Sequence, residues 1–149
     1  MRNDNVTSTI RERQLVNHTY IYNKYTYLTK DKPEIRKYQK LQLIKMEAAK
    51  AQLEGDYNLA IEKYKEIIAL SSKCTFPHHD DLKSESIFNL GAIYSQQGKF
   101  KEEAEEALKK ALSLDPSDKN IIASIYYALG SNYERQGRLN EAIERFIML

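Results

Sequence analysis

The sequence contains a single cysteine, Cys74, among its 149 residues. One cysteine excludes an intrachain disulfide and a four-cysteine metal knuckle, and it fits a reducing compartment. Apolar residues never form a run of about 18, the length that crosses a membrane, and the N-terminal residues hold no apolar block of signal-peptide length. We therefore expect a soluble, intracellular, cytoplasmic protein with no membrane partner.

Glycine is scarce as well, with five residues, and three of these recur at equivalent positions where a turn is expected. That distribution leaves no glycine-rich loop to cradle a phosphate. A nucleophile beside its base and a paired-carboxylate site are not recognisable either. The sequence therefore predicts a protein that is not an enzyme and that uses no cofactor.

Charge is nearly balanced, with 23 Lys and Arg against 21 Asp and Glu and a formal net charge of +2. This balance argues against a nucleic-acid or membrane-surface partner for the chain as a whole. Residues 1–40 are the exception, because they hold nine basic and four acidic side chains. The tyrosine-rich segment 11–40 therefore leaves RNA binding as an alternative, against a capping helix whose tyrosines are mostly buried.

Internal repetition is the strongest feature that is present. A Leu-Gly pair, a Tyr three residues later and a second Gly four residues after that occur twice, and an Ala follows each time. The first copy consists of Leu90, Gly91, Tyr94, Gly98, Phe100 and Ala104, and the second of Leu129, Gly130, Tyr133, Gly137, Leu139 and Ala142. Two unrelated helices would rarely share this spacing.

The spacing predicts a helical hairpin. Leu, Gly and Tyr lie about one turn apart on one helical face, and the small Gly there permits close approach of a second helix. Gly98 and Gly137 supply the permissive backbone that ends the first helix, and Pro116 stops the second helix of the middle hairpin. A weaker, earlier copy carries Gly55 and Ala60 in its turn and second helix.

This series resembles the tetratricopeptide repeat (TPR) family, whose period is about 34 residues. The repeats are longer here, since Gly55, Gly98 and Gly137 are 43 and 39 residues apart, as in long-repeat variants of that family. The resemblance implies an all-α fold of antiparallel helical hairpins stacked as a right-handed α-solenoid. It also implies a protein-binding adaptor or scaffold that serves complex assembly.

The repeats divide the chain into five segments. We expect an N-terminal helical extension or cap over 1–32, a divergent first repeat over 33–70, an inter-repeat loop over 71–83, a second repeat over 84–118 and a third over 119–149. A lone strand in the first segment would have no sheet to join, which favours a helix there.

The inter-repeat loop holds residue types that suit a metal ion, namely Cys74 and the run His78, His79, Asp80, Asp81. Adjacent His and Asp side chains rarely converge on one ion, and no Cys pair or helical His pair supplements them. We therefore expect no metal site, and a solvated loop in which Asp80 or Asp81 caps the next helix.

Charges on the second helix of the middle repeat follow a helical spacing. Glu105 with Lys109, and Glu106 with Lys110, are i,i+4 pairs in the favoured order. We interpret them as a solvated outer face and not as a binding patch.

In solenoids of this family, the first helices of successive hairpins line a concave groove. The candidate groove residues are those pointing away from the packed Leu, Gly and Tyr: Gln42, Lys45, Ala49 and Gln52; Glu85, Phe88, Asn89, Ala92 and Gln96; and Ser124, Tyr127, Ser131 and Arg135. Phe88 and Tyr127 are equivalent and would anchor a partner peptide or helix, or else pack against each other or under the N-terminal segment. Only Lys45 and Asn89 match the carboxylate clamp by which some family members grip chaperone tails, which argues against that ligand.

The last helix carries an apolar face made of Ile143, Phe146, Ile147 and Leu149, and no polar helix follows it. Solenoids usually cover such an edge. We expect it to meet further repeats or another subunit, by self-association or otherwise. The alternative function is therefore an architectural subunit that docks in a larger assembly through its repeat edges.

Without a metal site at Cys74, His78 and His79, zinc and EDTA should both leave the melting temperature unchanged. A zinc site of useful affinity would stabilise the folded state by mass action, so thermal unfolding with and without zinc tests the expectation. A reproducible zinc-dependent rise of several degrees would contradict it.

Overall fold

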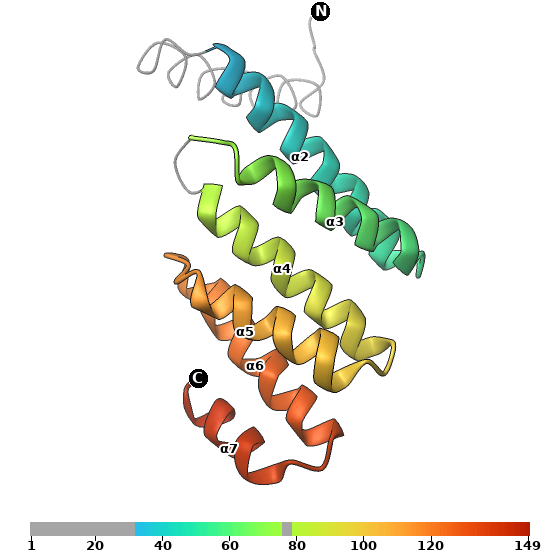
Figure 1. The fold of residues 1–149 in the computed structure, drawn as a ribbon, viewed down its shortest axis with the longest axis vertical. Helices are drawn as coiled ribbons and strands as arrows, with labels where there is room; N and C mark the ends of the chain where they lie inside the picture. Colours follow the sequence, from blue (N-terminus) through green and yellow to red (C-terminus); the bar gives the residue numbers. More distant parts are fainter. Residues whose placement is uncertain (1–31, 76–78) are drawn as a thin grey trace, which may run out of the picture. The chain divides into compact units, whose positions relative to one another are not determined.

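The computed structural model describes residues 32–75 and 79–149, and in these two ranges all regular structure is helical. In chain order the elements are α2 (Lys32–Leu53), α3 (Tyr57–Ser71), α4 (His79–Gln96), the short π-helix η1 (Phe100–Ala104), α5 (Glu105–Ser113), α6 (Lys119–Arg135) and α7 (Leu139–Ile147) (Figure 1). The expected all-α architecture is confirmed. The N-terminal extension, with most of the basic segment, lies outside the described residues.

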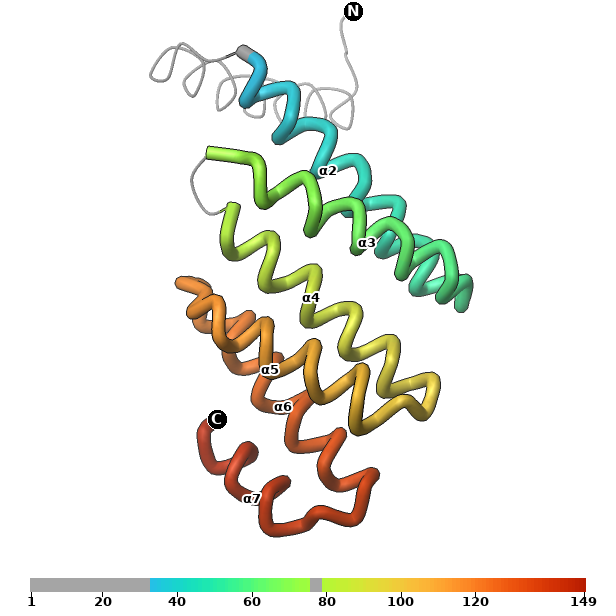
Figure 2. The backbone as a smooth tube through the Cα atoms, viewed as in Figure 1, coloured from blue at the N-terminus to red at the C-terminus, as the bar shows by residue number. Residues whose placement is uncertain are grey.

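The chain divides into two compact units at Gln39–Lys40. In the described part of the first unit, the Lys37 ammonium lies 2.8 Å from the Glu34 carboxylate on the same helix. The second unit holds the hairpins, whose helices pack against their neighbours in chain order and reverse direction at each turn (Figure 2). None of the described helices is long and apolar enough to cross a membrane.

The three hairpin turns share one backbone geometry, centred on Gly55, Gly98 and Gly137 with φ of +79°, +82° and +76°. After Gly98, the Lys99 N–H donates to the Tyr94 carbonyl at 2.9 Å, while the glycine N–H donates to the carbonyl three residues before it. This pair of bonds is a Schellman motif, and it recurs at the other two turns. The repeated glycine therefore marks a repeated left-handed residue that ends each first helix.

The glycines of the Leu-Gly pairs permit contact between the two helices of a hairpin. A Cβ atom added to Gly91 would lie 2.8 Å from Cγ of Leu108, and one on Gly130 would lie 2.5 Å from the Phe146 ring. Leu108 is fully buried, in a core that also contains Ile87, Ala111, Ile125, Leu129, Tyr133 and Ala142. This core joins the second hairpin (α4, η1, α5) to the third (α6, α7).

The second hairpin has one residue more than the third between its turn glycine and the inward-facing alanine. The structure accommodates the insertion as the π-helical turn η1, in which the Glu105 N–H donates to the Phe100 carbonyl five residues earlier. Ala104 thereby reaches a fully buried position, like its counterparts Ala60 and Ala142.

The inter-repeat loop is shorter than the expected span 71–83, because α4 begins at His79. Asp80 and Asp81 lie in its first turn, where the helix dipole favours carboxylates. The Asp81 carboxylate also accepts hydrogen bonds from the Ser117 backbone N–H, at 2.7 Å, and from the Ser117 hydroxyl. Asp81 therefore ties the start of α4 to the segment that precedes α6.

Phe146 is less exposed than the other residues of the expected apolar edge. Ile143, Ile147 and Leu149 are 55%, 75% and 58% exposed, but Phe146 is half-buried and packs inward. Its ring occupies the space beside Gly130 because the glycine has no side chain there. Phe146 therefore belongs to the hairpin interior.

We expect Gly91→Ala to lower the free energy of unfolding by about 1–3 kcal/mol, because the added methyl group overpacks the site beside the fully buried Leu108. Alanine otherwise favours a helix interior over glycine by about 1 kcal/mol, so the sign of the change is informative. Urea unfolding measures it. The reverse change at an exposed site, Ala49→Gly, calibrates the helix-propensity term, and stabilisation by Gly91→Ala would contradict the packing argument.

Candidate functional site

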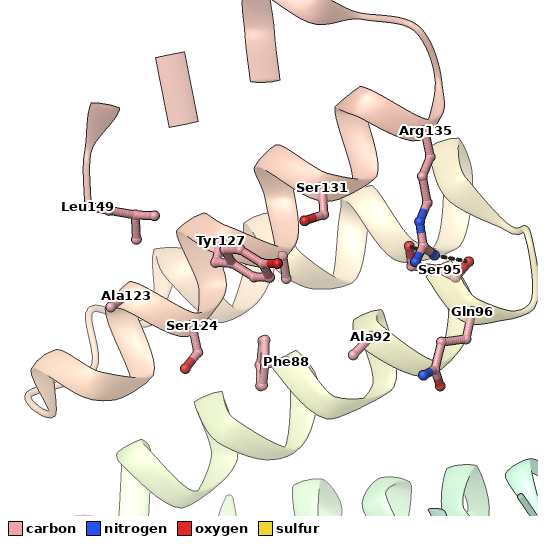
Figure 3. Close-up of a pocket in the computed structure, with 11 residues that line it drawn as sticks. Phe88, Ala92, Ser95, Gln96, Ala123, Ser124, Tyr127, Ser131, Arg135 and Leu149 are labelled. Atoms are coloured by element: carbon pink, nitrogen blue, oxygen red, sulfur yellow. Dashed lines mark hydrogen bonds between the residues drawn. The ribbon is translucent and has the colours of Figure 1, made fainter. Parts of the chain in front are cut away.

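A cavity of about 580 Å³ lies between α4 and α6, and we call it the α4–α6 groove (Figure 3). Its walls come from the first helices of the second and third hairpins and from the end of the chain. The lining residues are Phe88, Ala92, Ser95, Gln96, Ala123, Ser124, Tyr127, Ala128, Ser131, Arg135 and Leu149.

Many of the residues singled out in the sequence lie together in this groove: Phe88, Ala92, Gln96, Ser124, Tyr127, Ser131 and Arg135. Ala123, one turn before Tyr127 on the same helix, could have been found from helical spacing. Leu149 could not, because it reaches the groove from beyond α7 and no periodicity links it to α6. Leu149, which we expected at the outer edge, lines the groove wall.

Lys45 and Glu85 border a second cavity of about 320 Å³, which shares Phe88 and Ser124 with the groove. Their side chains form an ion pair, with Lys45 Nζ 3.1 Å from Glu85 Oε2. This pair neutralises the cation that matches the carboxylate clamp.

The remaining candidates, Gln42, Ala49, Gln52 and Asn89, line neither of these cavities. Gln52 is held elsewhere, because its side-chain oxygen accepts a hydrogen bond from the Tyr64 hydroxyl at 2.9 Å and so links α2 to α3. Ala49 is exposed on α2, whereas Gln42 and Asn89 are half-buried.

Tyr127 is the most exposed large hydrophobic side chain of the groove, at 61%. Its ring packs against Phe146 with 6.0 Å between centroids and a tilt of 52°. Phe88 is half-buried and packs on the core that joins the second and third hairpins. One aromatic wall is therefore supported from behind by α7 and the other by the core, which leaves little side-chain entropy to lose on binding.

Ion pairs and a hydrogen bond at Glu105 join the second hairpin to the third. This carboxylate lies 2.8 Å from both Arg138 and Lys109, and it accepts a hydrogen bond from the Tyr133 hydroxyl at 3.2 Å. Arg138 also covers the Tyr133 ring at 4.5 Å and pairs with Glu141. Glu105 is only 7% exposed, so the expected solvated outer face is wrong for this residue. Tyr133 and Arg138 lie too far along the chain for the i,i+4 pattern to reveal it.

A second bond between the same hairpins starts at the π-helical turn. The side-chain amide of Asn132 donates to the Phe100 carbonyl at 2.7 Å, and Asn132 is fully buried. Because α6 carries both Asn132 and Tyr133, these bonds fix α6 against the second hairpin. They thereby set the spacing between α4 and α6.

The ion pairs with Arg138 lower the pKa values of Glu105 and Glu141. Burial alone raises the pKa of Glu105, but hydrogen bonds from Lys109 and Arg138 outweigh it, so the pKa lies below its ordinary value. A hydrogen bond from Arg138 likewise lowers the pKa of Glu141.

The candidate metal ligands that the structure describes are Cys74, His79, Asp80 and Asp81. Cys74 is buried, with its sulfur 3.2 Å from the Leu70 carbonyl oxygen, and His79 lies 3.3 Å from the Asp80 carboxylate. In 32–75 and 79–149 no group of three or more His, Cys, Asp or Glu side chains has an arrangement that could hold a metal. His78 lies outside the described residues.

Stacked helical hairpins with a groove between their first helices define a helical-repeat interaction module. Family models described as tetratricopeptide repeat match residues 84–118 and 123–146. The chain is also 33% identical over 91 residues to the photosystem I assembly protein Ycf3 of Synechococcus sp. (strain CC9605). That alignment covers 61% of this chain and 46% of the relative, so the chain spans about half of that protein's length. No solved structure matches.

The second and third hairpins, over residues 84–118 and 123–146, are therefore tetratricopeptide repeats. Repeats of this family mediate protein–protein interaction, and the family match supports that general role for this chain.

Glu105→Gln should lower the free energy of unfolding by about 1–3 kcal/mol at pH 7, because a buried charge-assisted network loses its central anion. The pKa of Glu105 is lowered by folding, so its contribution is complete above the ordinary Glu pKa of about 4.3 and disappears as the pH falls through the lower folded-state pKa. Urea unfolding between pH 7 and 3 should therefore show the two proteins converging in acid.

The matched control is Glu106→Gln, which removes the same charge at the exposed neighbouring position and should be nearly neutral. Equal stability of the Glu105 and Glu106 variants at pH 7 would contradict the assigned role of Glu105.

Proposed function

We propose that the α4–α6 groove binds a segment of a partner protein and that the chain acts as an adaptor. The observation that carries the proposal is the exposed Tyr127 ring, held in place by Phe146 and facing the same cavity as Phe88. Aromatic side chains in preformed pockets are the usual anchors of protein interfaces. Covering them removes apolar area from water at little conformational cost.

The rest of the groove suits a polypeptide ligand. Ala92, Ala128, Ser124 and Ser131 are small and lie on both walls, so a partner backbone can approach both helices closely. A cavity of about 580 Å³ accommodates a few side chains and not a whole domain. These features favour a peptide or a single helix as the bound segment.

The relative supports a role in building a complex, because it is named as an assembly protein for photosystem I. We transfer only the general role, that of holding a component during assembly.

A specific observation favours a second candidate, docking through the faces on which repeats stack. Leu43 occupies the position of Ser86 and Ile125, which are 1% and 0% exposed inside the stack, yet Leu43 is 58% exposed. Ile143 likewise occupies the repeat position of Glu105, and it is 55% exposed whereas Glu105 is 7% exposed. In this candidate, an architectural subunit, the partner covers these stacking faces and leaves the groove open.

Site-specific photo-crosslinking separates the two candidates. A crosslinker at Ser124 reports on the groove, and one at Met46, exposed on α2 beside Leu43, reports on the stacking face. Partner adducts confined to the Met46 probe would replace groove binding with the architectural role.

Phe88→Ala and Tyr127→Ala should each weaken binding of the crosslinked partner by about 1–3 kcal/mol, because each removes a buried aromatic contact. Titration calorimetry measures the change, and circular dichroism checks the fold. Glu106→Ala on the exposed side of α5 is the control and should be nearly neutral. Undiminished binding by the Phe88/Tyr127 double variant would dismiss the groove.

A further inference from the structure

The two ends of the α4–α6 groove carry opposite charge. Arg135, in the last turn of α6, lies at one end. At the other end, the adjoining cavity is lined by Lys45, Glu85 and Asp118. Lys45 and Glu85 neutralise each other, and the Asp118 carboxylate at that end caps α6 by accepting a hydrogen bond from the Asn120 N–H at 2.8 Å.

Arg135 is exposed, and it makes no ion pair in the part of the chain that the structure describes. One of its terminal nitrogens donates to the Ser95 carbonyl and hydroxyl oxygens at 3.3 and 3.4 Å, both long bonds. These contacts hold the guanidinium across the end of the groove, as Figure 3 shows. An Arg side chain has five N–H donors in a planar fork that matches a carboxylate, so donors remain for a ligand.

The helix ends near Arg135 do not remove this charge. Arg135 lies in the last turn of α6 and contacts the last turn of α4, where carbonyl groups carry about half a negative charge per helix. Such dipoles act as partial charges at exposed sites, whereas a carboxylate brings a full charge and two hydrogen bonds to a guanidinium. The dipoles therefore position the guanidinium and leave it able to bind an anion.

The middle of the groove is largely apolar. Phe88 and Tyr127 stand on opposite walls (Figure 3), with Ala92 and Ala128 between the polar ends. Tyr127 and Arg135 are eight residues apart on one straight helix, which places them about 12 Å apart along its axis. A ligand that uses both must carry an apolar group and an anion at about that separation.

We propose that the groove selects an acidic amphipathic segment of a partner protein, with a large apolar side chain between Phe88 and Tyr127 and a carboxylate paired with Arg135. The proposal rests on the proposed function. The separation corresponds to about two turns of a bound helix or to about four residues of an extended segment. Among the residues that line the two cavities, Lys45 is already paired with Glu85, so the ligand's acid meets Arg135 and its direction is fixed.

The test is a selection of random 12-residue peptides displayed on phage against the full chain, followed by fluorescence anisotropy with the enriched peptide. Enriched sequences should combine Asp or Glu with a large apolar residue. Arg135→Gln should weaken the enriched peptide about 10- to 100-fold, the range expected for a charge-assisted hydrogen bond. The affinity should also fall with salt in the wild type and less so in the variant.

Two matched variants separate a specific pair from general attraction, which matters because residues 1–40 are basic. Lys110→Gln removes the same charge at an exposed position of α5 and should change the affinity less than twofold. Arg135→Glu should reverse the preference, so that a version of the peptide with Lys in place of its acid binds better than the original. Equal losses in Arg135→Gln and Lys110→Gln would overturn the proposal.

The outcomes also distinguish the acidic preference from the broader proposal that the groove binds a partner segment. Peptides whose binding is lost in the Phe88→Ala variant but unchanged in the Arg135→Gln variant would overturn the acidic preference. They would still support binding in the groove. A selection that yields only peptides insensitive to Phe88→Ala and Tyr127→Ala would overturn both.

Discussion

The α4–α6 groove depends on the contacts that hold the third hairpin against the second. Glu105 lies at the centre of these contacts. Its buried carboxylate receives Lys109 from its own helix and Arg138 and Tyr133 from the next hairpin. A buried anion is costly unless it is fully paired, so the arrangement tolerates few alternatives. The position of α6 against the second hairpin, and with it the spacing between the two walls of the groove, follows from this constraint.

The inserted residue of the second hairpin contributes to the same junction. It forces a π-helical turn, which brings Ala104 back into its inward position and presents the Phe100 carbonyl to Asn132. A local irregularity thus becomes an inter-repeat contact.

The groove combines two kinds of chemistry, a supported aromatic pair in its middle and a single cation at one end. The aromatic pair provides affinity and the cation provides direction.

The hairpins could be predicted because their determinants are local. Leu, Gly and Tyr on one helical face, and a glycine that ends the helix, lie within about two turns of one another, so spacing alone reveals them. The same periodicity indicated which side of each first helix faces away from the packing, and Phe88, Tyr127 and Arg135 do line one cavity. It failed where the deciding partner is distant in sequence, as with Glu105 and Arg138, Asp81 and Ser117, or Phe146 and Gly130.

The sequence by itself determined the helical class of this protein, its turns and the residues that pack within each hairpin, because these follow from backbone geometry and residue size over a few positions. Only the tertiary structure decided that Glu105 is buried, that Phe146 supports Tyr127, that Leu149 reaches the groove and that Lys45 is neutralised by Glu85. Each depends on the distance between side chains from different helices, and that distance is set by how the helices pack within and between the hairpins.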